Sequence, residues 1–146
     1  MSDEFLRWNI KVWQHRFGLD DWDIRLGHHP PDVEGAYAQV SYRLGERAAE
    51  VRIDPATPNT DIAESHIAHE MVHLALKPYT VIAEGVAAQM KEPFRAYLAN
   101  ALEDAEERVI ESILRSHGFA RFEPYGDLAA DWPAFAVDDV SRSVSS

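Results

Sequence analysis

The chain of 146 residues contains no cysteine, which excludes disulfide frameworks, thiolate metal sites and cysteine nucleophiles. Basic residues are also few. The sequence has 14 lysines and arginines against 25 aspartates and glutamates, so its formal net charge is −11. A protein that binds the phosphate backbone of a nucleic acid needs a basic face, and no cluster of lysine or arginine supplies one here. We therefore expect no nucleic-acid partner.

Long apolar runs are missing too. No stretch approaches the length that spans a membrane, and the first residues, MSDEFLRW, lack the basic and apolar regions of a signal peptide. We therefore expect a cytoplasmic protein with no membrane partner. The hydrophobic fraction of 46% and the charged fraction of 27% are typical of globular domains. Residues 1–137 are expected to form a single domain, and the acidic, serine-containing end at 138–146 is expected to be a disordered tail.

One stretch carries recognisable chemistry: the sequence His69-Glu70-Met71-Val72-His73. Histidines four residues apart on a helix lie one turn apart on the same face, so both imidazoles can bind one metal ion. The glutamate after the first histidine projects beside that ion. Zinc suits imidazole and carboxylate ligands in a tetrahedral site that leaves one position open for water. The motif therefore predicts a zinc-dependent hydrolase with His69 and His73 as metal ligands.

The residues around the motif predict a helix over Asp61–Leu76. Asp61 is a candidate N-cap, and Glu64 three residues later completes a capping box. Lys77 then lies near the C-terminus of the helix, and Pro78 is expected to end it. One face carries an apolar stripe, and a second face carries the histidines, of which His66 is expected to pack or to support the site rather than bind metal. The apolar stripe consists of Ala63, Ile67, Met71 and Leu74.

The rest of the chain predicts an α+β fold. Ser2–Phe17 has apolar residues at helical spacing and is followed by a glycine, which favours an N-terminal helix. Alternating apolar and polar residues predict three short strands, the last two joined by a hairpin, in a mainly antiparallel sheet. Pro78–Pro93 is expected to be a loop with a helical piece, and Phe94–Ser116 a long helix. The expected strands are Trp22–Gly27, Ala36–Tyr42 and Ala48–Asp54.

A third metal ligand has to come from outside the motif helix. On the helix Phe94–Ser116, a rotation of about 100° per residue places Glu106 inside the apolar stripe. A carboxylate that is buried without a partner is very costly, and a zinc ion is a suitable partner. Glu106 is therefore the preferred third ligand. Glu107 and Glu103, at the margin of the stripe, and Glu92 in the preceding segment remain alternatives.

With these elements the chain resembles the compact zincin metallopeptidases, especially the small zincin-like enzymes of bacteria and bacteriophages. The resemblance covers the order of elements over Trp22–Leu114, and its one specific motif is the histidine–glutamate run described above. It implies that Glu70 is the general base and that the glutamate of the later helix, here Glu106, completes the zinc site. It also implies that an extended substrate lies along an edge strand above the motif helix, which would be Ala48–Asp54.

The chain departs from two branches of that family. Leu76 and Tyr79 stand where the metzincin pattern requires a glycine and a third ligand, which excludes that branch. The gluzincin spacing would place the third ligand near Glu92. That residue directly precedes Pro93 and lacks a helical setting, so the later glutamate is preferred.

The predicted function is a zinc-dependent metallopeptidase that hydrolyses peptide or amide bonds of a peptide or protein substrate. Metal-activated water attacks the carbonyl while Glu70 takes the water proton and delivers it to the leaving amine. Candidates for the donor that stabilises the tetrahedral intermediate are Tyr79, His117 and Tyr125, although a structural role is the simpler explanation of each. One alternative is a catalytically silent zincin-fold binding module in which the metal is a structural staple. Another is a metal-free interaction protein with an accidental motif.

Overall fold

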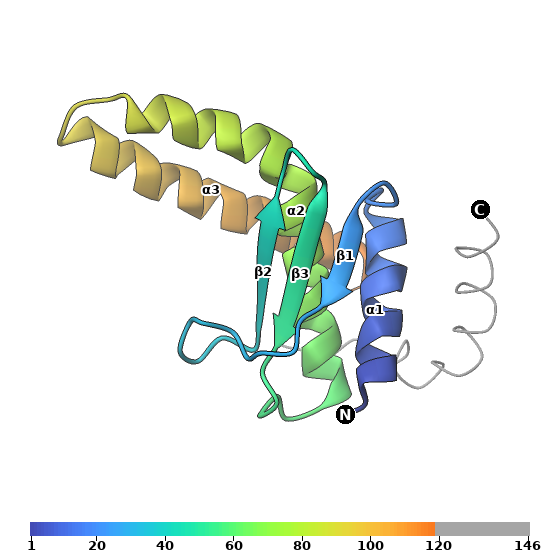
Figure 1. The fold of residues 1–146 in the computed structure, drawn as a ribbon. Coiled ribbons are helices and arrows are strands. Elements are labelled where there is room, and N and C mark those ends of the chain that lie inside the picture. Colours follow the sequence, from blue (N-terminus) through green and yellow to red (C-terminus); the bar gives the residue numbers. More distant parts are fainter. Residues whose placement is uncertain (119–146) are drawn as a thin grey trace.

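The computed structural model describes residues 1–118, which form three helices and a three-stranded mixed sheet in an α+β arrangement. The helices α1 and α2 cover one face of the sheet, and α3 lies beside α2 (Figure 1). The expected tail at 138–146 lies outside the described residues. In chain order the elements are α1 (Asp3–Arg16), β1 (Asp23–Leu26), β2 (Ala38–Arg43), β3 (Ala48–Ile53), α2 (Thr60–Ala88) and α3 (Phe94–Ser116).

The sheet has the strand order β1-β3-β2. β3 runs parallel to β1 and antiparallel to β2, so the sheet is mixed and the prediction of a mainly antiparallel sheet is wrong. The hairpin between β2 and β3 is confirmed. The prediction that Ala48–Asp54 forms an edge strand is wrong, because β3 is paired on both sides and β2 is an edge. A hairpin pattern does not specify which of its two strands receives the third strand, and this left the edge undetermined.

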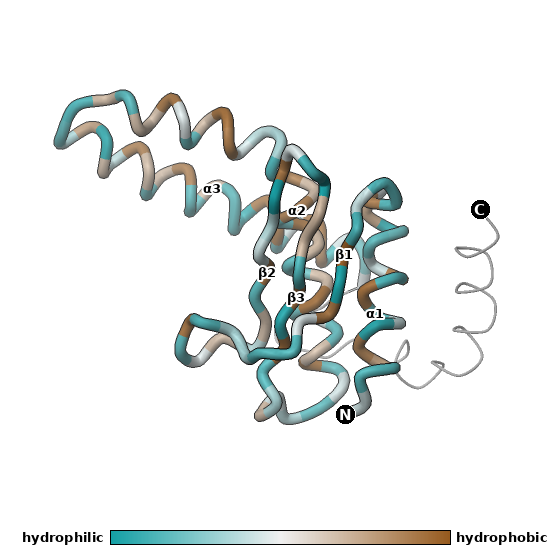
Figure 2. The backbone as a smooth tube through the Cα atoms, in the orientation of Figure 1, coloured by the Kyte–Doolittle hydropathy of each residue, from teal (hydrophilic) through white to brown (hydrophobic). Residues whose placement is uncertain are grey.

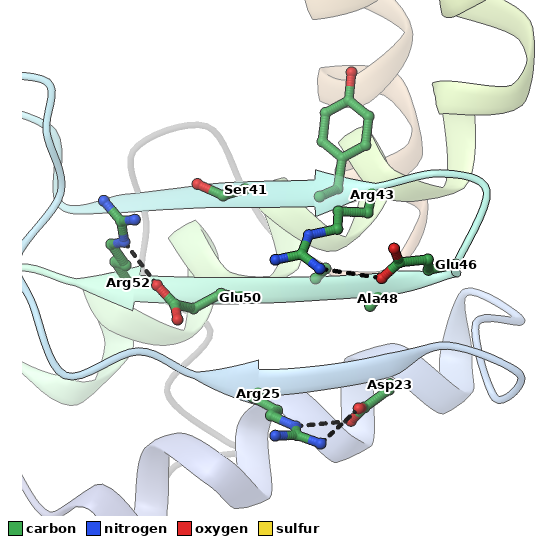
Figure 3. Close-up of a pocket in the computed structure, with 10 residues that line it drawn as sticks. Asp23, Arg25, Ser41, Arg43, Glu46, Ala48, Glu50 and Arg52 are labelled. Atoms are coloured by element: carbon green, nitrogen blue, oxygen red, sulfur yellow. Dashed lines mark hydrogen bonds and ion pairs between the residues drawn. The ribbon is translucent and has the colours of Figure 1, made fainter.

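The two faces of the sheet have opposite chemistry, as the alternation of residues in β3 predicts. Ala49, Val51 and Ile53 are buried against the helices together with the apolar stripe of α2. On the other face, arginines and carboxylates form ion pairs such as Arg52–Glu50 at 2.8 Å (Figure 3). The core therefore lies on the side of the sheet that faces α1 and α2.

α2 begins and ends differently from the sequence-based expectation. Its N-cap is Asn59, whose side-chain oxygen accepts a hydrogen bond from the amide of Ile62 at 2.9 Å, so the capping box of Asp61 and Glu64 is wrong. The helix also continues through Pro78 to Ala88. A proline inside a helix removes one backbone hydrogen bond and favours a kink rather than an end where packing supports the next turns. Figure 1 shows α2 changing direction near its middle.

Beyond this bend, the second half of α2 and the first half of α3 project from the sheet as a helical hairpin (Figure 1). The expected loop at Pro78–Pro93 is therefore mostly helix, whereas the expected bounds of the later helix are confirmed. Figure 2 shows apolar positions along this hairpin. Of the predicted apolar stripe on α3, Ile110 is fully buried but Val109 is 46% exposed, since much of the helix lies beyond the sheet. Other exposed apolar residues of the hairpin are Tyr79, Ile82, Val86, Phe94 and Tyr97.

Candidate metal centre

His69 and His73 lie one turn apart on α2, as the motif predicts. Their Nε2 atoms are 3.1 Å apart, and their ring centroids are 4.8 Å apart. Both side chains are mostly covered, with 27% and 18% of their surface exposed. Burial and the neighbouring His73 lower the pKa of His69, so its ring is held in the neutral form that binds metal.

α3 brings two adjacent glutamates to opposite sides of His73. Glu107 lies at the Nε2 side: its Oε1 is 3.1 Å from Nε2 of His73, and its Oε2 is 3.4 Å from Nε2 of His69. Glu106 lies at the other ring nitrogen, with Oε1 3.0 Å from Nδ1 of His73. The Glu106 side chain is only 12% exposed, in line with the prediction, but Glu107, one of the sequence-based alternatives, is the carboxylate that approaches both histidines.

The group of His69, His73 and Glu107 could hold a metal ion. With metal–ligand distances of about 2.0–2.1 Å, a tetrahedral zinc separates its ligand atoms by about 3.3 Å. Nε2 of His69 and Nε2 of His73 are 3.1 Å apart, and Glu107 approaches them with different oxygens, Oε2 at 3.4 Å and Oε1 at 3.1 Å. With one ligand atom from each residue, the three atoms lie within 4.8 Å of one another. Two neutral imidazoles and one carboxylate form the donor set of a catalytic zinc site, in which a fourth position remains open. The donor set is therefore one that could hold a metal ion.

Lys77 is a part of this centre that the sequence analysis missed. It follows His73 by one helical turn, so it lies on the same face of α2 as the two histidines. Its Nζ is 3.7 Å from Oε1 of Glu106, and both side chains are largely buried. The sequence analysis expected the helix to end at Pro78, so it placed Lys77 near the helix C-terminus and did not consider it as a neighbour of the histidines.

Glu70 lies beside the histidines and under β2. Burial raises the pKa of Glu70 to about 7, although the nearby His73 and the peptide N–H of Val40 favour its charged form. The hydrogen bond from Asp54 to the carbonyl of Tyr37 fixes the pairing of β2 with β3. In this register the main-chain groups of Val40 point to the outer edge of the sheet. The edge strand therefore runs past the general base predicted from the sequence.

The other sequence-predicted candidates lie away from the two histidines or outside the described residues. Glu92 accepts a hydrogen bond from the amide of Ala96 at the start of α3, and Glu103 is exposed. His66 packs edge-on against Tyr37 with ring centroids 5.2 Å apart. Among the proposed donors, Tyr79 is 75% exposed, His117 packs on Phe17 with ring centroids 4.9 Å apart, and Tyr125 lies outside the described residues.

An apolar groove of about 730 Å³ opens from the metal centre between α2 and α3. Its inner end is formed by His73, Glu106 and Glu107. The groove then follows the projecting hairpin, where its walls are made mainly of short apolar side chains. These wall residues include Leu76, Ala83, Ala87, Ala99, Leu102 and Val109.

Comparison with protein-family models, with curated proteins and with solved structures gave no match to this chain. Within residues 1–118, none of the helices combines the length and the apolar character that crossing a membrane requires. What can be said about function therefore comes from the residues themselves and from their geometry.

Proposed function

We propose that the protein is a zinc-dependent metallopeptidase of the zincin type. The observation that carries this proposal is the meeting of His69, His73 and Glu107, from two different helices, with one ligand atom of each within 4.8 Å of the others. Glu107 replaces Glu106 as the proposed third ligand, because Glu106 contacts the nitrogen of His73 on the far side. A carboxylate in that second position orients a metal-binding imidazole and makes it more basic.

Glu70 is the proposed general base. A bound zinc ion would supply the positive charge that polarises a carbonyl group and acidifies a water molecule. Glu70 would accept the proton of the attacking water and return it to the leaving amine. Its raised pKa of about 7 suits a group that takes up and releases a proton near neutral pH. The neutral rings of His69 and His73 and the anionic Glu107 would keep the centre positively charged overall.

Two surfaces beside this centre support a peptide as the substrate class. β2 presents the main-chain groups of Ala38 and Tyr42 and the carbonyl of Val40 along an edge, and an extended peptide can pair with such an edge. The apolar groove between α2 and α3 begins at the same centre and offers room for side chains. The proposed substrate strand thus lies on β2 rather than on the strand expected from the sequence.

The first test separates metal binding from catalysis. Zinc in protein purified without added metal is measured by elemental analysis, and cleavage is measured with casein and with a quenched fluorescent peptide library. We expect about one zinc per chain and expect it to be lost in the variant H69A/H73A. Glu70→Gln removes the base but no ligand, so it should retain zinc while cleavage falls by about 10²–10⁴-fold.

Each other outcome has a definite meaning. Cleavage that survives Glu70→Gln would contradict the assignment of the base. Stoichiometric zinc without any cleavage would support the silent binding module instead. An absence of zinc, together with unchanged thermal stability in a chelator, would contradict the metal centre as a whole. Glu34→Gln, at an exposed loop position, is the matched control for the loss of one carboxylate.

A further inference from the structure

We infer that Lys77 is a positioning residue that determines which of the two adjacent glutamates of α3 faces the metal. This inference rests on the proposed function, since it assigns a role in a zinc centre. The contacts of Lys77 with Glu106 and of Glu106 with His73 exist without metal, so they can be tested in the metal-free chain.

The first step is the position of Lys77 between a strand and a helix. Its side chain is 14% exposed, and its Nζ lies 5.3 Å from the ring centroid of Tyr42 on β2, a distance typical of a cation–π contact. On its other side, Nζ lies 3.7 Å from Oε1 of Glu106. A long side chain covered from two directions loses most of its conformational freedom, so the ammonium group is held in place.

The second step is the effect of Lys77 on Glu106. The Glu106 side chain is only 12% exposed, and its Oε1 also lies 3.0 Å from Nδ1 of His73. A largely buried carboxylate needs positive charge or hydrogen-bond donors around it. Lys77 supplies the charge and His73, in the tautomer with its proton on Nδ1, supplies a donor, and both contacts lie on the Nδ1 side of the ring.

The third step concerns the choice between neighbours. Successive residues of a helix point about 100° apart, so Glu106 and Glu107 cannot approach His73 from the same direction. Glu106, fixed at Nδ1, can accept the proton of a neutral His73 ring there, which leaves Nε2, the nitrogen beside His69 and Glu107, to bind the metal. Without the ammonium group, Glu106 loses its cationic partner, and the preference for Glu107 as ligand weakens.

The experiment compares Lys77→Met with Lys91→Met, an exposed lysine in the connection between the hairpin helices. In metal-free protein at about pH 8, where an ordinary histidine is neutral, nitrogen NMR reports the tautomer of His73. The native chain and Lys91→Met should show the proton on Nδ1, and Lys77→Met should show a mixture. Lys77→Arg, which keeps the cation, should restore the native tautomer. A purely structural lysine would change thermal stability without moving this signal.

A second measurement uses zinc affinity by chelator competition. In the native background, we expect Glu107→Gln to weaken zinc binding by at least about 100-fold and Glu106→Gln by about 10-fold. In the Lys77→Met background, these two effects should become similar. Lys77→Gln, with a polar end and a similar length, is measured beside Lys77→Met, and circular dichroism establishes that each variant is folded.

The inference is overturned if the Lys77 variants keep both the native tautomer and the native ratio of the two glutamate effects. A native chain that binds no zinc would end the proposed function, but the tautomer would still decide the role of Lys77. A native tautomer with the proton on Nε2 would overturn the inference directly, because Glu106 would then not hold His73 as described.

Discussion

The surroundings of Glu64 strongly change the pKa of its carboxyl group. It is the only carboxyl group in residues 1–118 that is fully buried, and neither of its oxygens has a hydrogen-bond partner among those residues. Burial raises its pKa from 4.5 to about 8; the charge of Asp61 adds to the rise, and that of Arg16 opposes it. Glu64 is therefore protonated in the folded chain at neutral pH, whereas it ionises in the unfolded chain.

This difference predicts how stability depends on pH. Below about pH 4.5 both states hold the proton, and the group contributes no pH dependence. Between about 4.5 and 8 only the unfolded state releases it, so the free energy of unfolding falls by about 1.4 kcal/mol per pH unit. Above about 8 the loss is complete. Glu64→Gln cannot ionise, and we expect it to be more stable than the native chain by about 2–5 kcal/mol at pH 8.

Urea denaturation between pH 4 and pH 9 measures this effect. The gain from Glu64→Gln should vanish at the acidic end and grow toward the alkaline end. Glu34→Gln removes an exposed carboxylate and should leave the profile close to that of the native chain. A constant difference between Glu64→Gln and the native chain at every pH would show that packing, rather than ionisation, separates them.

At the scale of the element, the start of α2 offers a test between two caps. Asn59, with φ −157° and ψ 172°, has the extended backbone of an N-cap, and its side chain binds the amide of Ile62. We expect Asn59→Ala to lower the free energy of unfolding by about 1 kcal/mol. Asp61→Ala should cost less, because it removes only a charge near the helix start and also relieves Glu64 of a like charge.

Thermal and urea unfolding of the two variants checks this order. An Asp61→Ala variant that is clearly less stable than Asn59→Ala would restore the cap favoured by the sequence alone. Ser65→Ala is a control within the same first turns. Its hydroxyl donates to the carbonyl of Ile62 at 2.9 Å and forms no part of either cap.

The elements differ in how far the sequence predicts them, for physical reasons. Periodicity predicts α1 and the three strands, since each has an apolar face against a common core. It also predicts the bounds of α3, although only Ile110 of that helix is buried. Local rules failed at Pro78, where α2 continues although proline removes one backbone hydrogen bond. The predicted position of the third strand was also wrong. The order of strands depends on long-range pairing, and the alternation pattern within a strand carries no information about its partners.

For the same reason, the sequence predicts the histidines of the candidate metal centre but not its glutamate. The spacing of His69 and His73 predicts their common face, because both belong to one helix. The choice between Glu106 and Glu107 depends on where α3 crosses α2, which follows from the bend near Pro78. Glu106 and Glu107 point about 100° apart around α3. A helical wheel of α3 alone does not show which of these directions faces the histidines of α2.

At the scale of the whole molecule, α3 is attached to the body by few buried contacts. Ile110 is the one residue of α3 that is buried in the described part of the chain, and an apolar groove separates much of α3 from α2. The proposed metal centre crosses that same boundary, since His69 and His73 belong to α2 and Glu107 belongs to α3. A bound ion would therefore fasten α3, the helix with the fewest buried residues, to α2.

This arrangement predicts where zinc stabilises the chain. At a free zinc concentration of about 100 times the dissociation constant, binding adds about 2.7 kcal/mol to the free energy of unfolding. Amide hydrogen exchange through local openings should slow in α3 and in α2 around His73, where opening would break the contact through the ion. Amides of β3 that exchange only by global unfolding should slow by the same free energy as unfolding itself. Glu107→Gln should abolish the protection of α3 selectively, because α2 alone still offers two imidazoles. Slowing confined to amides that exchange by global unfolding, with unchanged local exchange in α3, would contradict the idea that zinc fastens α3 to α2.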